Sequence, residues 1–220
     1  MQRKNDEQLK QEVLRELRWD TRVGCRDVEV AVYEGVVTLG GTVTSYAGKV
    51  AAQDAAHRVA GVLDVANDIE VKVPAVHTDT EIAQAVRSTL EWDVLVPDEN
   101  IQSTVTNGEV TLEGRVNTLR EREDAERAVR CLSGVCAVFN QITVSPPKVD
   151  PDDLRLNIEE ALERRAEREA GRIRIEVADG EVELWGRVHS WQEKRAVLGS
   201  IMHAPGVGAI REHLRIDPYF

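Results

Sequence analysis

The sequence predicts an α+β protein made of three tandem small α-β-β-α-β units, each a three-stranded mixed sheet with two helices on one face. The main observation is a repeat. The pattern Gly-x-Val-x-Leu-x-Gly-x-Val occurs at residues 35–43, 108–116 and 180–188, with offsets of 73 and then 72 residues. A Gly-Val pair follows each copy at the same two offsets. Separated landmarks that share one spacing indicate a repeated structural unit.

Proline-containing connectors separate the copies. Pro74 follows the first copy, and Pro146 with Pro147 follows the second. Proline favours short, stiff and extended connections. We therefore expect unit one at residues 1–74, unit two at residues 78–145 and unit three at residues 150–217.

A helix is predicted at the start of each unit. In unit two, Ile82, Val86 and Leu90 recur at helical spacing, which places them on one face. Thr78 and Glu81 have the spacing of a capping box, in which each side chain binds the other residue's backbone N–H. Units one and three open with similar apolar runs, so the same helix is expected in all three.

Two strands joined by a tight turn follow this helix. The predicted turns are the pairs Glu34-Gly35, Asn107-Gly108 and Asp179-Gly180. Pairs of this kind tolerate the positive φ angles of a type I′ turn, which joins neighbouring strands directly. Strands one and two of each unit should therefore pair antiparallel.

A second helix and a third strand complete each unit. Thr118 with Glu121, and Ser190 with Glu193, have capping-box spacing, and a Gly-Val pair ends each helix. If strand three runs parallel to strand two, the helical crossover between them should be right-handed. The strand order is left open by the sequence.

A glycine recurs on the apolar face of strand two, at Gly41, Gly114 and Gly186. Side chains alternate between the two faces of a strand, and this position has the parity of the core. A missing Cβ there would let a helix approach the sheet closely, or would permit a bulge. We interpret these glycines as structural, like Gly35, Gly108 and Gly180 in the turns; contact with a ligand is the alternative.

A polar residue also recurs among the apolar residues of strand three, as Asn67, Asn140 and Glu212. We expect it at the margin of the sheet, bonded to the backbone of a loop, because asparagine readily makes such bonds. A polar contact to a shared ligand is the alternative.

The tryptophans distinguish the units from one another. Trp19 and Trp92 occupy matching positions at the ends of the first two predicted helices, where unit three has Arg164. Three placements remain open for them: over the core, in a contact between units, or exposed toward a partner or a membrane interface. Trp185 lies on the opposite strand face from Leu184, which marks an exposed or inter-unit surface. Trp19, Trp92 and Trp185 are therefore the candidate interaction residues.

Residues typical of catalytic, cofactor or metal sites do not come together in the sequence. The five histidines show no H-x-x-x-H spacing, and the three cysteines form no paired C-x-x-C motifs. No glycine-rich phosphate loop and no G-x-S-x-G turn is present. The sequence therefore predicts a protein that is not an enzyme and has no catalytic residue, cofactor or metal ligand.

The charge and the hydropathy of the chain limit the classes of partner and the locations that we expect. The formal net charge is −11, and each third of the chain is acidic. Such a surface repels phosphate backbones and anionic headgroups, so a nucleic-acid partner is not expected. No apolar run approaches the roughly 20 residues that span a bilayer, and the charged start differs from a signal peptide. We expect a cytoplasmic location, or a periplasmic one if a leader has been removed.

Taken together, the motifs resemble the BON domain. In unit two they read Leu112-x-Gly114-x-Val116, Gly134-Val135 and Val138-x-Asn140-x-Ile142-x-Val144. Unit three departs from this pattern at Glu212. The resemblance implies a bacterial, non-enzymatic stress-response protein that binds phospholipid or a membrane surface. A soluble protein-interaction scaffold, or a chaperone-like stress protein that binds protein partners, is the alternative function.

Overall fold

The computed structural model describes residues 4–24, 27–74, 77–165 and 173–218. Unit one contains α1 (Asp6–Trp19), β1 (Asp27–Tyr33), β2 (Val36–Val43), α2 (Tyr46–Arg58), β3 (Asp64–Asn67) and β4 (Glu70–Val71). Unit two contains α3 (Asp79–Trp92), the 3-10 helix η1 (Asp98–Asn100), β5 (Ile101–Thr106), β6 (Glu109–Val116), α4 (Leu119–Arg130) and β7 (Ala137–Val144). Unit three contains α5 (Pro151–Arg165), β8 (Ile173–Ala178), β9 (Glu181–Val188), α6 (Trp191–Met202) and β10 (Ala209–Ile216).

Each unit has the predicted α+β architecture, and the strand order is now defined. The second strand lies in the centre, antiparallel to the first and parallel to the third. In unit one the third strand is interrupted, so that β3 and β4 pair with β2 in turn. The prediction of three α-β-β-α-β units, each with a mixed sheet, is confirmed.

The hairpin turns have the predicted conformation. Glu34, Asn107 and Asp179 have φ values of 48°, 53° and 49°, and the glycine that follows each has a positive φ as well. Two successive positive φ angles define a type I′ turn. In unit two, the Asp79 carboxylate also accepts hydrogen bonds from the backbone amides of Asn107 and Gly108, at 2.8 and 2.9 Å. The first helix is therefore tied to the hairpin.

The recurring glycine of strand two meets the backbone of its hairpin partner instead of a helix. Gly114 has a φ of +145°, and a Cβ built there would lie 2.1 Å from the carbonyl oxygen of Asn100. At Gly41 the corresponding distance, to the carbonyl oxygen of Asp27, is 1.8 Å. The sequence predicted a close approach by a helix that packs on the sheet, and this partner was wrong: the neighbour is backbone at the start of the first strand (Asp27) or just before it (Asn100).

The recurring asparagine binds the second helix. Asn140 Nδ2 donates to the carbonyl oxygen of Arg122 in α4, at 2.8 Å, and Asn140 Oδ1 accepts from the amide of Ile142, at 3.2 Å. Asn67 donates to the carbonyl oxygen of Lys49 in α2 in the same way. The sequence predicted a loop backbone as the partner, and this was wrong: the side chain joins strand three to helical backbone.

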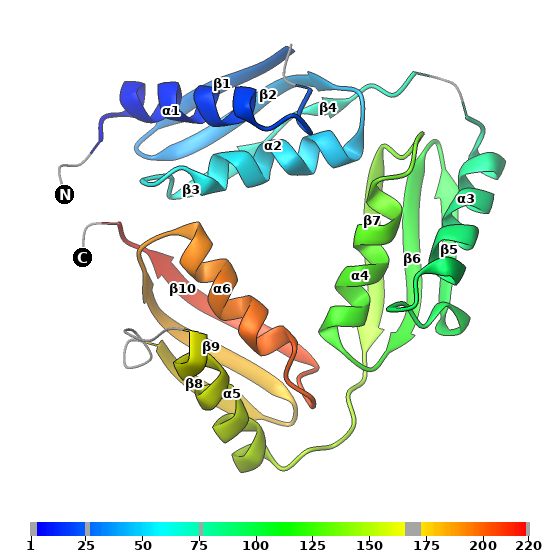
Figure 1. The fold of residues 1–220 in the computed structure, drawn as a ribbon, viewed down its shortest axis with the longest axis vertical. Coiled ribbons are helices and arrows are strands. Elements are labelled where there is room, and N and C mark those ends of the chain that lie inside the picture. The colour runs from blue at the N-terminus through cyan, green and yellow to red at the C-terminus, as the bar shows by residue number, and fades with distance from the viewer. Residues whose placement is uncertain (1–3, 25–26, 75–76, 166–172, 219–220) are drawn as a thin grey trace.

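The three units have separate cores and are arranged as a triangle. Each core is a cluster of buried apolar residues drawn from one unit. Figure 1 shows α2, α4 and α6, the second helices of the units, on the sides that face the middle of the triangle. The second helices therefore contribute to the contacts between units, and α2 packs against α6.

Candidate interaction surfaces

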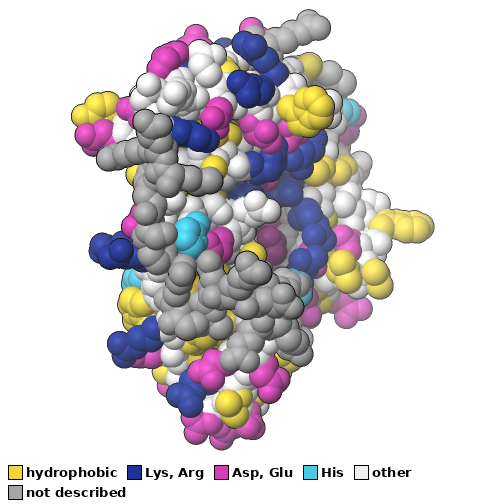
Figure 2. All heavy atoms as spheres, turned by 60° about the vertical axis from the view of Figure 1, so that its left-hand side comes forward, with side chains coloured by type: hydrophobic (Ala, Val, Ile, Leu, Met, Phe, Trp, Pro, Cys, Tyr) yellow, Lys and Arg dark blue, Asp and Glu magenta, His cyan; other side chains and the backbone are white. Residues whose placement is uncertain are grey.

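Trp19 and Trp92 are exposed. Each is the last residue of the first helix of its unit, and the exposed fractions of the two residues are 84% and 87%. Placements over the core and between units are excluded by these values. Figure 2 shows large hydrophobic side chains that project from the molecular surface. The side chain of Arg164, at the matching position of unit three, lies outside the described residues.

An apolar tip surrounds Trp92 but not Trp19. Val94 and Leu95, which follow Trp92 after a single aspartate, are 96% and 53% exposed. The matching positions in unit one are the polar residues Thr21 and Arg22. Unit two therefore presents three neighbouring apolar side chains, Trp92, Val94 and Leu95, which we call the unit-two tip.

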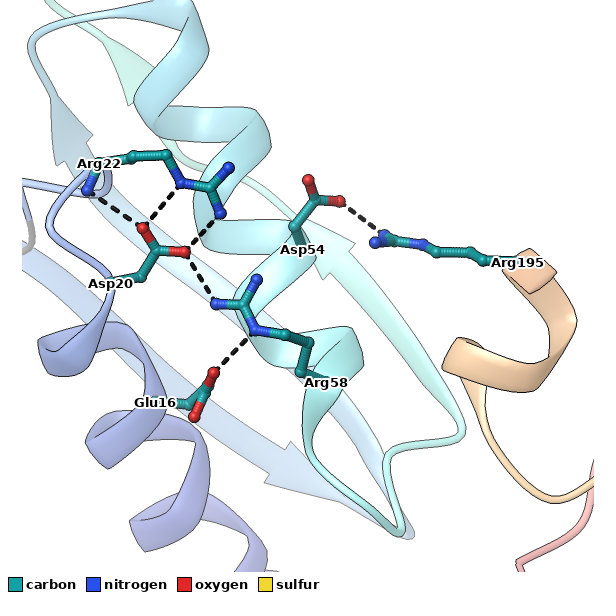
Figure 3. Close-up of polar contacts among 6 residues, drawn as sticks. All are labelled: Glu16, Asp20, Arg22, Asp54, Arg58 and Arg195. Atoms are coloured by element: carbon teal, nitrogen blue, oxygen red, sulfur yellow. Dashed lines mark hydrogen bonds and ion pairs between the residues drawn. The ribbon is translucent and has the colours of Figure 1, made fainter. Parts of the chain in front are cut away.

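Trp19 instead precedes a network of ion pairs, drawn in Figure 3. Asp20 accepts from Arg22 at 2.6 Å and from Arg58 at 2.8 Å, and Arg58 also donates to Glu16 at 2.7 Å. The hydrogen bond from Arg22 holds the pKa of the Asp20 carboxyl well below its ordinary value. The network anchors the segment after α1 to α2 and so fixes the backbone that carries Trp19.

Trp185 is half-buried in a row of side chains across the third sheet, between the exposed residues Arg174 and His213. Its ring stacks on His213 with 5.4 Å between ring centroids, and the Arg174 guanidinium lies 5.7 Å from the ring centre. These residues are direct cross-strand neighbours, because Trp185 pairs with Arg174 on β8 and with His213 on β10. Trp185 therefore contributes to a surface of unit three, and these ring contacts do not reach another unit.

Trp191, which the sequence analysis did not select, joins unit three to unit one. It is the first residue of α6, and its ring stacks on His57 with 3.9 Å between centroids. Its indole Nε1 donates to the carbonyl oxygen of Leu63, at 3.2 Å. Beside it, Arg195 forms an ion pair with Asp54 at 2.6 Å, seen in Figure 3.

Matching residues make the other two contacts between units. Tyr46 and Leu119 open α2 and α4, at the offsets of 73 and 72 residues that relate them to Trp191. Tyr46 packs against the core of unit two, and Leu119 packs against the core of unit three. The first residue of each second helix thus contacts the next unit, and unit three contacts unit one. Three contacts of this head-to-tail kind close a ring.

A cavity at the contact between units two and three is lined by side chains of both charges, including Glu123 and Glu126. It has a volume of about 280 Å³, and Arg122, Arg127 and Arg130 line it together with Leu119 and Met202. Figure 2 shows Lys and Arg side chains gathered in a band along the recess on the drawn face. Arg122 donates to the carbonyl oxygen of Asn140, and Arg127 pairs with Asp124 at 2.5 Å. Two of the three guanidinium groups are therefore already engaged.

The spacing of the repeat could have identified Trp191, Tyr46 and Leu119. All three follow the capping residue of the second helix by one position. A bulky residue repeated at a helix start, outside the apolar face of the helix, is a signal for contact beyond the unit. The candidates chosen from the sequence were tryptophans that are not conserved across all three units. Selection by difference between units missed the residues that make the contacts between units.

Groups suited to metal binding are not found in the part of the chain that the structure describes. Within residues 4–24, 27–74, 77–165 and 173–218, no three His, Cys, Asp or Glu side chains are placed to hold a metal ion. Among the same residues, no helix is both long and apolar enough to cross a membrane.

Comparison with known proteins finds one similar sequence and two aligned structures. The chain is 30% identical over 122 residues to osmotically-inducible protein Y of Escherichia coli (strain K12). This match covers 53% of the chain and 61% of that protein, which is less than two thirds of its length. Two structures of CdsD, a structural protein of the type III secretion system of Chlamydia trachomatis, align over 96% and 94% of the chain. The two alignments include 92% and 96% of the CdsD chains, with sequence identities of 13% and 12%. Both have a TM-score of 0.28.

The family comparison covers nearly the whole chain. The BON domain matches three times, at residues 5–73, 78–146 and 150–218. Each matched segment contains one α-β-β-α-β unit with a type I′ hairpin and a central second strand. The chain therefore belongs to the BON domain family, of which it carries three tandem copies.

Proposed function

We propose that this protein is a non-enzymatic binding module that associates with phospholipid membrane surfaces during the stress response of a bacterium. Family membership and the relative named as osmotically inducible support the stress-related setting. The observation that carries the membrane proposal is the exposure of Trp19 and Trp92 at matching positions. Tryptophan favours the boundary between water and lipid, because its apolar ring and polar N–H suit both sides.

The net charge determines what kind of membrane binding is expected. A chain with a formal charge of −11 is repelled by anionic headgroups, so attraction has to come from apolar side chains. The unit-two tip supplies three such side chains, and Trp19 supplies a fourth on a separate unit. Two weak sites on one molecule reinforce each other when both can reach the same surface.

Co-sedimentation with vesicles tests this proposal. We expect binding to phosphatidylcholine vesicles, and weaker binding when phosphatidylglycerol is added at low salt. Trp19→Ala and Trp92→Ala should each weaken binding about tenfold, because each removes a large apolar ring from the interface. Tyr33→Ala, which removes an aromatic residue that is 73% exposed elsewhere on unit one, is the matched control. Absence of sedimentation with both kinds of vesicle would contradict membrane binding.

A protein partner is the second candidate, and the asymmetry of the unit-two tip favours it. Val94 is 96% exposed next to Trp92, and no equivalent apolar pair follows Trp19. Exposed apolar clusters of this kind mark protein interfaces as well as lipid contacts. If the function is protein binding, Trp92→Ala should reduce recovery of a soluble partner while Trp19→Ala leaves it unchanged.

A further inference from the structure

We propose that the contact between units three and one is a pH-sensitive latch, which protonation of His57 opens. The latch consists of Trp191 and Arg195 on α6, and of His57, Asp54 and Leu63 on unit one. His57 is only 6% exposed, although it lies on the outer end of α2, because Trp191 covers it. A titratable ring is thus buried by the contact between two units.

The hydrogen bond to the His57 ring fits only the neutral form of the ring. Arg195 Nη2 lies 3.0 Å from His57 Nδ1, and a guanidinium can only donate. Nδ1 must therefore accept, which leaves the single proton of the neutral ring on Nε2. Protonation of Nδ1 would place an N–H against the Arg195 guanidinium and would remove this hydrogen bond. Among the described residues, buried Nε2 has no hydrogen-bond partner that could stabilise a charged ring.

The charged groups around His57 act in both directions. Asp54 of α2 and Asp64 of β3 favour the charged ring, whereas Arg195 and Lys194 of α6 oppose it. Burial is the largest effect, and together these influences lower the pKa of His57 from its ordinary value of 6.5 to about 4. In an open form the ring would be in water and would titrate near its ordinary value.

The direction of the pH effect follows from this difference. As the pH falls below 6.5, His57 of the open form becomes protonated, whereas His57 of the closed form stays neutral down to about pH 4. The closed form is therefore most favoured above pH 6.5 and loses roughly a factor of ten for each pH unit below it. Between pH 6.5 and pH 4.5 the ratio of closed to open molecules should fall about 40-fold.

Only this contact carries a histidine at the matching position. The residues related to His57 by the repeat are Arg130 in unit two and Met202 in unit three. Neither changes its charge near neutral pH. Because the three cores are separate, loss of one inter-unit contact leaves each core intact. Acid should therefore release unit three from unit one and leave the units folded.

Hydrogen exchange of the Trp191 indole N–H in the full chain tests the latch. This proton is held by the carbonyl oxygen of Leu63 and exchanges only when the latch opens. After correction for the intrinsic pH dependence of exchange, its protection should fall about 40-fold from pH 6.5 to pH 4.5. The indoles of Trp19 and Trp92, which are exposed, serve as internal controls. Unchanged protection over this range would overturn the proposal.

Three variants separate the latch from general acid effects. His57→Phe keeps a ring for Trp191 to stack on but cannot be protonated, so its protection should be independent of pH. His77→Gln removes an exposed histidine from the connector and should behave as the unsubstituted chain does. Trp191→Ala should give a larger radius of gyration in small-angle X-ray scattering already at pH 7.5. If His57→Phe loses protection in acid as the unsubstituted chain does, His57 is not the switch.

Discussion

Replacement of Gly114 by alanine should destabilise unit two strongly. The residue has a φ of +145°, and the added Cβ would lie 2.1 Å from the carbonyl oxygen of Asn100, a backbone atom that cannot rotate away. A conformation that only glycine adopts freely costs another residue about 1–3 kcal/mol. Displacement of the neighbouring strand adds about 1–3 kcal/mol, as in other overpacked sites. We expect a total loss of about 2–6 kcal/mol in the free energy of unfolding of unit two.

Urea unfolding followed by hydrogen exchange of the β5 and β6 amides measures this loss in unit two alone. Gly40→Ala is the control and is read from the β1 and β2 amides, because it lies in unit one. A Cβ at this position, next to the recurring glycine Gly41, would meet no atom within 4 Å. That variant should change stability by no more than about 1 kcal/mol. Should Gly114→Ala also stay within about 0.5 kcal/mol of the unsubstituted chain, the close approach of Asn100 would not be the reason for glycine at this position.

Two further changes test the polar contacts. Asn140→Ala removes the bonds to the Arg122 carbonyl and the Ile142 amide and should lower the stability of unit two by about 1–3 kcal/mol, measured by urea unfolding. An unchanged midpoint would show that these bonds are replaced by water. Asp20 has a lowered pKa, so its contribution to unit one is present above its ordinary pKa and is lost as the pH falls below it. Asp20→Asn should therefore make the acid unfolding of unit one less steep in nuclear magnetic resonance titrations, and an unaltered titration would contradict this.

Much of each unit could be predicted from local sequence. Asn107-Gly108 predicted a type I′ turn because few residue pairs tolerate two positive φ angles, and both residues have them. Thr78 and Glu81 predicted a capping box because its bonds span only three positions, and both bonds are present. Turns and helix caps depend on residues only a few positions apart, so the local sequence is enough to predict them. The family resemblance rested on features of this kind.

The candidate interaction residues were predictable only in part. Trp19 and Trp92 end matching helices, as the repeat predicted, but their exposure depends on which side of the helix end the core occupies. The partner of Gly114 could not be inferred either, since strand parity identifies a face but not the backbone that approaches it. Sequence periodicity gives the orientation of a residue within its own element and carries no information about its neighbour.

By itself, the sequence determined the number of units, the order of their elements and the antiparallel pairing of each hairpin. It did so because the repeat preserves short-range patterns at constant offsets. Only the tertiary structure decided that the units close into a ring and that Trp191 covers His57. The indole of Trp191 and the carbonyl of Leu63 are 128 residues apart, so no local pattern relates them. Their contact depends on how three separately folded units pack together, and that arrangement buries a histidine which the sequence alone would leave in solvent.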